Sequence, residues 1–268
     1  MVAFAANSLL CRLALAGGWI DAPTFATVRI GSGALLLSWL VRGSGRGDRA
    51  DWQAVGSLAI YLLPFTLAYL TLGAGTGALL LFGSAQLTMI GAGLYGGERR
   101  SWLAWCGVGV AAAGFVSLLW PGATAPPLTG ASLMTVAGVA WGVYSLRGQT
   151  SRQPLASTAQ NFLFVLPWAL AINLLFVGGV HVTPRGLALA AVSGTLTSAL
   201  GYVVWYSALP RLPAITAGTV QLSVPVIAAF GGVLLLAEPV TPRLLVCAVA
   251  ILGGIGLVLW RRHRPASA

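Results

Sequence analysis

The side chains of this sequence that are best able to do chemistry are amides, hydroxyls and aromatic rings placed inside long apolar stretches. Phe82 and Gln86 are four residues apart, and Trp141 precedes Tyr144 and Ser145 by three and four, so each set shares one face of a helix. Polar groups at membrane depth face the protein interior or a solute path. We therefore predict a substrate pathway lined by Asn7, Phe82, Gln86, Trp141, Tyr144, Ser145, Tyr202, Trp205 and Gln221.

The same residue types also have structural roles inside a membrane. Asn, Gln and Ser side chains join neighbouring helices by hydrogen bonds, and Trp and Tyr rings gather at the membrane interface. For each residue above, the sequence therefore leaves two interpretations open: a wall of the pathway or a packing contact between helices.

Groups suited to acid–base or metal chemistry are absent from the middle of the apolar stretches. Because no Asp, Glu, His or Lys lies there, a carboxylate proton relay is disfavoured and facilitated movement is predicted. His181 and His263 fall in a loop and in the C-terminal tail, so neither can act as the base of an intramembrane serine protease. Cys11, Cys106 and Cys247 lack the CxxC spacing of a zinc site. The sequence thus predicts no enzyme, catalytic residue, metal or cofactor.

Composition identifies the solvent that these stretches require. Of the 268 residues, 57% are apolar and only 7% are charged, and the mean hydropathy is +0.88. Soluble domains carry roughly 25% charged residues, so water is excluded as the main solvent. The net charge of +10 arises from arginines spread along the chain between the apolar stretches, without any lysine. A nucleic-acid-binding protein would instead cluster its basic residues on one face.

The elements that position these side chains are predicted to be transmembrane helices, each needing about 20 mostly apolar residues. The fold class is therefore an all-α membrane protein forming a single transmembrane domain over residues 1–268, with ten transmembrane helices as two inverted five-helix repeats around a central cavity. Pro225 falls near the middle of the ninth stretch and is the predicted hinge. The stretches are 2–18, 23–41, 53–71, 74–96, 102–120, 130–147, 157–177, 185–207, 214–236 and 242–260.

Every second connection between the stretches is basic, which predicts the orientation. Arginines concentrate in cytoplasmic connections of membrane proteins, so both termini are placed in the cytoplasm and the chain in the cell (inner) membrane. The inside arginines are then Arg42, Arg46, Arg49, Arg99, Arg100, Arg147, Arg152, Arg211, Arg261, Arg262 and Arg264, whereas Arg12, Arg29, Arg185 and Arg243 are assigned to helix ends near the other side.

The second half of the chain can be aligned with the first. At an offset of 140 residues, Thr76 to Trp120 falls on Thr216 to Trp260 without a gap, and Glu98 meets Glu238. We predict repeat one over 1–122 and repeat two over 130–262. Since five spans per repeat is an odd number, the second copy is inverted, an architecture that supports alternating access in transporters. Both glutamates lie near helix ends and are predicted to cap helices or pair with Arg99 or Arg243; proton coupling through them is the alternative.

In these features the whole chain resembles the ten-helix EamA-type branch of the drug/metabolite transporter superfamily. Two positions depart from the family's usual pattern: Phe4 replaces a Trp, and Ala85 replaces a frequent Pro. Phe82, Trp141 and Tyr202 fall where the aromatic amino-acid exporter group places cavity rings. The resemblance is carried by Phe4-Ala5-Ala6-Asn7-Ser8, Trp141-Gly142-Val143-Tyr144-Ser145, Arg29, Gly97-Glu98, Ala237-Glu238-Pro239 and Ser223-Val224-Pro225-Val226.

The resemblance implies a transporter that exports small neutral metabolites, with hydrophobic or aromatic amino acids as the expected cargo. The alternatives within the same fold are a lipid-linked-sugar flippase and a nucleoside or drug exporter. The expected partners are a small-molecule substrate and membrane lipid, with no nucleic acid. Glycine-rich runs at 107–114 and 253–256 predict that the fifth and tenth helices pack as a pair or form a dimer surface, so the protein is expected to be a monomer or homodimer.

Overall fold

The computed structural model describes residues 1–42, 50–95, 102–122, 124–149, 151–175, 179–208 and 220–260. Within these ranges the regular structure is helical, and an isolated bridge between Ile20 and Val182 is the only β pairing. The helices are α1 (Val2–Ala16), α2 (Ala22–Leu40), α3 (Trp52–Ala68), α4 (Ala74–Tyr95), α5 (Trp102–Leu119), α6 (Leu128–Gln149), α7 (Pro154–Leu175), α8 (Pro184–Val192), the π-helix η2 (Ser193–Leu200), α9 (Gly201–Ala208), α11 (Ser223–Leu236) and α12 (Pro242–Trp260).

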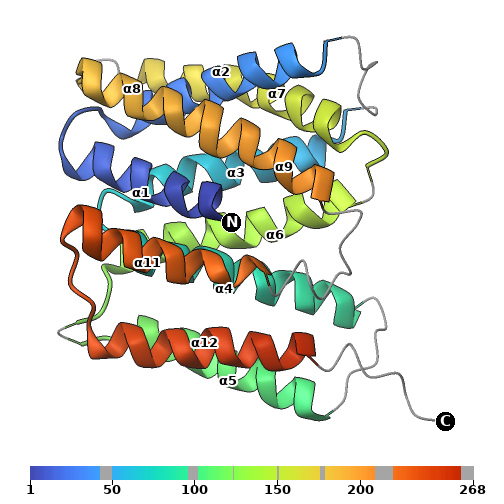
Figure 1. The fold of residues 1–268 in the computed structure, drawn as a ribbon, viewed down its shortest axis with the longest axis vertical. Coiled ribbons are helices and arrows are strands. Elements are labelled where there is room, and N and C mark those ends of the chain that lie inside the picture. Colours follow the sequence, from blue (N-terminus) through green and yellow to red (C-terminus); the bar gives the residue numbers. More distant parts are fainter. Residues whose placement is uncertain are drawn as a thin grey trace.

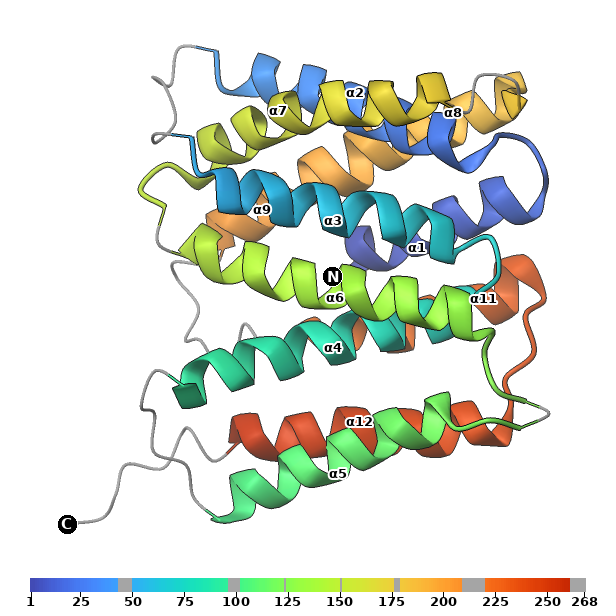
Figure 2. The same cartoon turned by 180° about the vertical axis from the view of Figure 1, so that it is seen from behind.

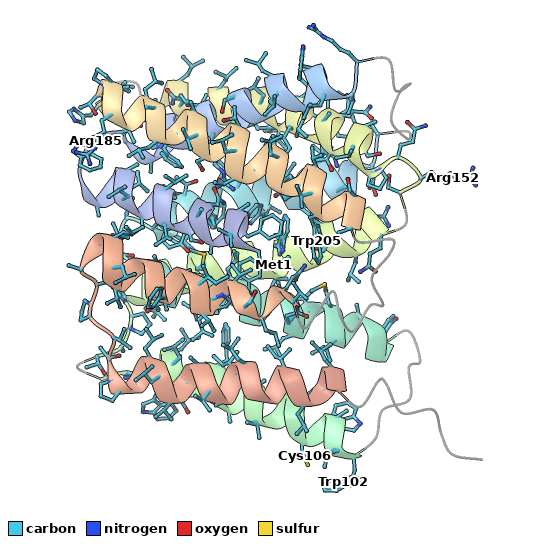
Figure 3. The ribbon with its side chains drawn as sticks, viewed as in Figure 1. Met1, Trp102, Cys106, Arg152, Arg185 and Trp205 are labelled. Carbon is cyan, nitrogen blue, oxygen red and sulfur yellow. The ribbon has the colours of Figure 1, made fainter. Side chains whose placement is uncertain are left out.

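The helices lie side by side in one bundle, with α2, α7 and α8 at one end of the stack and α5 and α12 at the other (Figures 1 and 2). Their ends form two faces. On the left of Figure 1, α1, α3, α5, α7 and α11 end, and we call this the Glu238 face. The opposite face, where α3, α5 and α7 begin, is called the Asp51 face. Arg185 lies at the Glu238 face and Arg152 at the Asp51 face (Figure 3).

Five helices are long and apolar enough to cross a membrane among the residues described, and they lie in 74–93, 102–119, 154–175, 184–205 and 242–259. Helices α1, α3 and α11 are apolar but shorter. Helices α2 and α6 are long, with 19 and 22 residues, yet less apolar, because they carry polar side chains that point inward, including Arg29 and Tyr144. The lower apolarity of α2 and α6 is therefore explained by side chains that face the interior.

Two predicted spans differ from the helices observed. Residues 185–207 form α8, η2 and α9 in succession, and the wide π turns of η2 have no signature in the hydropathy pattern. In the span 214–236, residues 214–219 lie outside the described part, and the helical backbone is interrupted at Leu222 before α11 begins. Pro225, predicted near the middle of this span, is the third residue of α11. It occupies the first turn of α11, where a missing N–H costs no helical hydrogen bond.

Short polar residues define several helix ends at the two faces. The side chains of Asp21, Asp51 and Thr183 each accept a hydrogen bond from a backbone N–H in the first turn of α2, α3 and α8, respectively. Pro184 follows Thr183 at the first helical position, where its fixed φ suits the helix. Helix α11 stops at Ala237, whose φ of 51° places it in the left-handed region. The chain reversals that separate the helices are thus encoded locally.

Packing separates inner from outer helices. In α4, 72% of the apolar window is buried, compared with 28% in α5. Helix α4 lies between α6 and α11, whereas α5 packs chiefly on α12 at the edge of the bundle. Trp102, Trp105 and Trp120 on or next to α5 are exposed, as expected for residues facing lipid and its interface. The core that positions the site is therefore formed by α1 to α4, α6, α7, η2, α9 and α11.

The predicted pairing of the fifth and tenth spans is confirmed by the contact between α5 and α12. Its closest point joins two glycines. A Cβ atom on Gly254 would lie 2.5 Å from the Gly107 carbonyl oxygen, and one on Gly107 would lie 2.6 Å from the Gly254 carbonyl oxygen. Because both obstacles are backbone, the helices can approach this closely only without side chains at these positions.

We expect Gly254→Ala to lower the stability of the protein by about 1–3 kcal/mol, since the added methyl group forces α5 and α12 apart. Gly253→Ala is the matched control, because a Cβ atom there meets nothing within 4 Å. Thermal unfolding in detergent micelles measures both variants. Equal midpoints for the two variants would contradict a tight α5–α12 contact.

Candidate substrate pathway

A cluster of aromatic rings occupies the interior of the bundle, with Trp141 of α6 at its centre. The Trp141 ring lies 4.9 Å from Tyr61 of α3 and 6.0 Å from Phe4 of α1, measured between centroids. Tyr202 of α9 stacks on it at 5.5 Å with an interplanar angle of 15°, and Tyr144 lies 5.8 Å away. The cluster therefore combines rings from both halves of the chain, in side chains that are almost fully buried.

Asn7 lies beside the π-helix. Its side-chain oxygen accepts hydrogen bonds from Ser193 at 2.7 Å and Thr197 at 3.3 Å, and all three side chains are buried. The π turns of η2 place these hydroxyls towards α1, and such segments are frequent at functional sites. The predicted residue Asn7 is thus part of a polar contact between the first helix and the middle of the eighth span.

Gln86 and Gln221 are brought together across the two halves. The Gln86 amide nitrogen donates to the Gln221 side-chain oxygen at 3.1 Å, and the side chains are 2% and 4% exposed. Gln221 directly precedes the helix interruption at Leu222. A direct amide–amide bond at this depth joins α4 to the segment before α11, and its breakage would leave both amides unpaired.

The other predicted residues have more varied positions. Trp205 is buried, and its ring lies 6.3 Å from that of Phe4, so it extends the aromatic cluster. Phe82 is buried in the hydrophobic core of α4. Ser145 is half-buried and donates to the Trp141 carbonyl of its own helix at 2.7 Å. The structure thus gathers Trp141, Tyr144, Tyr202 and Trp205 directly.

Arg29 is a buried cation in the middle of α2, and it was missed as a candidate for the pathway. The side chain is 1% exposed; its Nε donates to Ser198 of η2 and its Nη2 to the Tyr61 hydroxyl, both at 3.1 Å. The guanidinium carbon lies 4.7 Å from the Phe65 ring centroid. The expectation that Arg29 belongs near a helix end is therefore wrong. An arginine inside an apolar helix was the available sequence signal.

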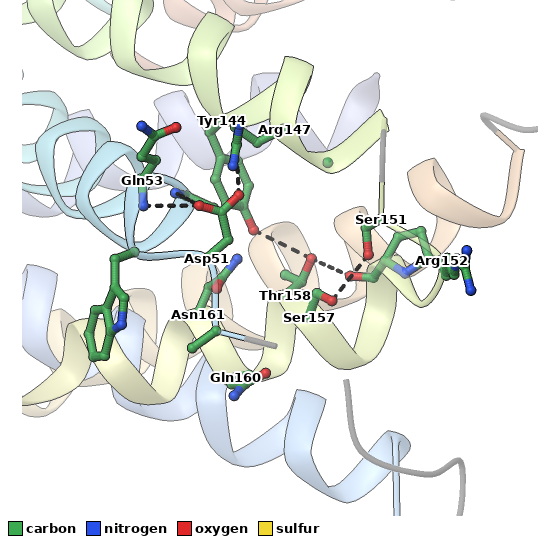
Figure 4. A pocket seen from close by; sticks show the side chains of 15 residues that line it. Asp51, Gln53, Tyr144, Arg147, Ser151, Arg152, Ser157, Thr158, Gln160 and Asn161 are labelled. Atoms are coloured by element: carbon green, nitrogen blue, oxygen red, sulfur yellow. Dashed lines mark hydrogen bonds and ion pairs between the residues drawn. The ribbon is translucent and has the colours of Figure 1, made fainter. Parts of the chain in front are cut away.

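A cavity of about 550 Å³ opens at the Asp51 face between α3, α6 and α7 (Figure 4). Its polar wall includes Asn161, Thr158 and the ion pair of Asp51 with Arg147, whose Nε lies 2.7 Å from the Asp51 carboxylate. Tyr144 lines this cavity and also contacts Trp141, so one side chain connects the cavity to the aromatic cluster. Of the residues predicted for the pathway, Tyr144 is the one that lines this cavity.

The Arg147 guanidinium beside Asp51 holds the pKa of that carboxyl below its usual value, and two backbone N–H groups add to this effect. A lowered pKa in the folded state stabilises the protein at neutral pH, and the gain is lost as the pH falls through that lowered pKa. Because both side chains are partly exposed, at 45% and 33%, we expect Asp51→Asn to cost roughly 0.2–1 kcal/mol at pH 7. Thermal unfolding as a function of pH tests this: the stabilities of the two proteins should converge as the pH falls below the lowered pKa of Asp51. A gap that does not change with pH would contradict the ion-pair origin.

At the Glu238 face, Arg12 and Glu238 join three parts of the bundle. The Arg12 Nε donates to Glu238 at 3.2 Å and its Nη1 to the Tyr69 carbonyl at 2.9 Å. The other Glu238 oxygen accepts the Ala74 N–H at 2.7 Å, where α4 begins. The capping role is confirmed, but the pairing with Arg243 is wrong, because Arg243 donates to the carbonyls of Ser117 and Trp120. Glu98 lies outside the described residues.

An apolar hollow of about 420 Å³ lies on the side of the bundle between the start of α1, η2 and α9. Phe4 and Trp205 belong both to its wall and to the aromatic cluster. Met1 and Trp205 are close to mid-depth in Figure 3. This hollow therefore brings the edge of the ring cluster to the lipid-facing side of the bundle.

Apolar helices around a buried polar and aromatic interior define a multi-pass membrane protein. The EamA-like transporter family matches residues 128–260. An uncharacterized protein of Pseudomonas aeruginosa is 50% identical over 97% of this chain and 91% of its own length. The chain belongs to the EamA-like transporter family, within the drug/metabolite transporter superfamily, as the sequence resemblance predicted.

More distant relatives share parts of the sequence or the fold. The threonine/homoserine exporter RhtA of Salmonella typhimurium is 34% identical over 52% of this chain and 48% of the exporter. RhtA of Escherichia coli K12 is 34% identical over 49% and 46%, respectively. The chain thus matches about half the length of these exporters. A solved crystal structure superposes with a TM-score of 0.69 and 19% identity over 98% of both chains, which shows a common fold.

Proposed function

We propose that this protein exports small neutral metabolites from the cytoplasm by alternating access, with hydrophobic or aromatic amino acids as the preferred cargo. The observation that carries this proposal is the buried ring cluster around Trp141, to which both halves of the chain contribute. A site lined by aromatic faces suits an apolar side group. The family, and the naming of the RhtA relatives as threonine/homoserine exporters, support export as the direction and amino acids as the cargo.

We also propose the ten-helix inverted-repeat architecture for this transporter. Helix packing supports it, because several contacts recur when each helix is replaced by the equivalent helix of the other half. Helix α6 packs on α3 and α4, and its counterpart α1 packs on η2 and α11; α3 packs on α7, as η2 packs on α2. Three further contacts, α2 with α7, α4 with α11 and α5 with α12, pair an element with its own counterpart. Such pseudo-symmetry provides two related states, one open to each side.

The two faces differ in a way that fits one of these states. The Asp51 face contains the 550 Å³ cavity that reaches Tyr144, whereas Arg12 and Glu238 hold three parts of the bundle together at the other face. The basic connections of the sequence belong to the Asp51 face, so we assign this face, with both chain termini, to the cytoplasm of a cell (inner) membrane. Arg46, Arg49, Arg99, Arg100, Arg211, Arg261, Arg262 and Arg264, which contribute to this bias, lie outside the described residues.

Motion between states requires a flexible point, and we place it at the interruption before α11. Leu222, next to Gln221, is the N-cap of α11, and Pro225 follows in the first turn of that helix. Breaking the bond between Gln86 and Gln221 would free the segment before α11 from α4. Both amides therefore serve as pathway residues that change partners during the cycle.

Uptake of labelled amino acids into proteoliposomes tests the proposal, with and without a pH gradient. Saturable flux of phenylalanine, leucine or a similar amino acid that needs no gradient is the expected result, with Gln86→Ala slower than wild type. Flux that depends on the gradient would support proton coupling instead. Absence of flux above empty liposomes for the whole panel would overturn the amino-acid assignment and favour the flippase or nucleoside alternatives.

A further inference from the structure

Arg29 retains an unsatisfied hydrogen-bond donor inside the bundle. Its Nε and Nη2 are bonded to Ser198 and Tyr61, but Nη1 is buried without a hydrogen-bond partner among the described residues. The indole Nε1 of Trp141 is likewise buried without a hydrogen-bond partner among the described residues. Tyr61 connects the two groups, since its hydroxyl accepts from Arg29 and its ring lies 4.9 Å from that of Trp141.

These two orphan groups share one chemical property. A guanidinium and an indole N–H donate hydrogen bonds and accept none. Buried donors without partners are costly, so a ligand that stabilises this region must supply acceptor atoms. Both residues contact Tyr61, and a group with two acceptor oxygens offers one acceptor for each donor.

The charge of Arg29 specifies the ligand further. The acidic residues in the described part of the chain are engaged elsewhere: Asp51 with Arg147, Glu238 with Arg12, and Asp21 with the backbone N–H groups of Thr24 and His181. Aromatic rings and hydroxyls surround Arg29 instead. A buried charge without a counter-ion is strongly disfavoured. An anionic ligand would neutralise it, and arginine binds carboxylates through two parallel hydrogen bonds.

We infer that Arg29 and the Trp141 indole N–H form a carboxylate-binding subsite, so that the transported solute is a carboxylic acid whose apolar side group packs on the surrounding rings. This inference rests on the proposed transport function and narrows its substrate class. The carboxylate completes the hydrogen bonds of Arg29 and Trp141. Phe4 and Tyr202 then offer aromatic surface next to Trp141 for the side group, and Trp205 extends this surface beside Phe4.

Ligand-induced stabilisation of the purified protein tests the subsite without requiring transport. The probes are L-phenylalanine and 3-phenylpropionate, which carry a carboxylate, and L-phenylalaninamide and phenethylamine, which do not. We expect the two carboxylates to raise the unfolding temperature in a saturable way and the other two to have no effect. Equal stabilisation by all four probes, or by none, would overturn the inference.

Substitution of Arg29 provides the second arm. Arg29→Gln should weaken 3-phenylpropionate binding by at least roughly tenfold, because a hydrogen bond to a charged group is lost, and Arg29→Lys should retain part of the affinity. Arg185→Gln is the control, since Arg185 lies over the Trp19 ring at the Glu238 face. Undiminished binding in Arg29→Gln would overturn the assignment. If that variant does not fold, the comparison of the four probes on the wild-type protein still tests the carboxylate-binding subsite.

The outcomes separate this subsite from the proposed transport function. Carboxylate-selective stabilisation without amino-acid flux would keep the subsite and overturn the amino-acid cargo. In the opposite case, phenylalanine flux is observed, but phenethylamine and phenylalaninamide inhibit it as strongly as 3-phenylpropionate. That result would support the transport function and overturn the role of Arg29.

Discussion

Replacing Trp141 with alanine is expected to reduce the initial rate of amino-acid flux at least roughly tenfold. The Trp141 ring contacts Phe4, Tyr61, Tyr144 and Tyr202, and an aromatic pair contributes about 0.5–1.5 kcal/mol beyond the area it buries. A tenfold decrease in rate corresponds to about 1.4 kcal/mol. Loss of one such contact with the substrate, together with disorder among the remaining rings, is enough to produce it. Flux per reconstituted protein in liposomes is the measurement.

Matched variants separate substrate contact from general packing. Trp168→Ala removes the same side chain from α7, where it is 63% exposed, and should leave flux unchanged. Trp141→Phe keeps a ring and should be intermediate. If Trp141→Ala transported at the wild-type rate, Trp141 would be a packing residue and the pathway assignment would fail. Unfolding temperatures of the variants identify any loss of flux caused by instability.

Removing the charge of Glu238 is expected to open the face that it holds closed. Glu238→Gln retains an oxygen that can accept from Ala74 but loses the ion pair with Arg12. Hydrogen bonds to charged groups contribute about 1.5–3 kcal/mol, and a loss of about 1.4 kcal/mol shifts a two-state equilibrium tenfold. The population open at the Glu238 face should therefore rise roughly tenfold or more.

Thiol labelling measures this shift. Thr76 and Glu238 line the same small hollow of about 220 Å³, so Thr76→Cys, with the three native cysteines replaced by serine, reports on access from that face. We expect a membrane-impermeant maleimide to label this site several times faster in Glu238→Gln. Asp51→Asn is the control, because it removes an ion pair at the opposite face and should not accelerate labelling. Equal rates in all backgrounds would show that Arg12 and Glu238 do not restrain this face.

Several features of this protein follow from the sequence alone. An apolar fraction of 57% with 7% charge requires a membrane, and a membrane requires helices that satisfy their own backbone hydrogen bonds. Where the structure describes them, the apolar stretches therefore lie on helices, and the motifs around Asn7, Trp141 and Glu238 indicated the family. The glycines of α5 and α12 predicted their close packing, because small residues have that effect whatever the surrounding fold.

The tertiary structure decided which of these side chains meet. Arg12 and Glu238 are 226 residues apart, and Arg29 and Ser198 are 169 apart; helical periodicity gives the face of each side chain but not the helix that covers it. Helical periodicity could therefore not show that Glu238 pairs with Arg12 rather than with Arg243. It also could not show that Arg29 is buried beside Tyr61. The π turns of η2 could not be predicted either, because hydropathy depends on residue type and not on which carbonyl oxygen each backbone N–H bonds to. The sequence determined the solvent and the helices, whereas packing between distant helices determined the partners of every buried charge.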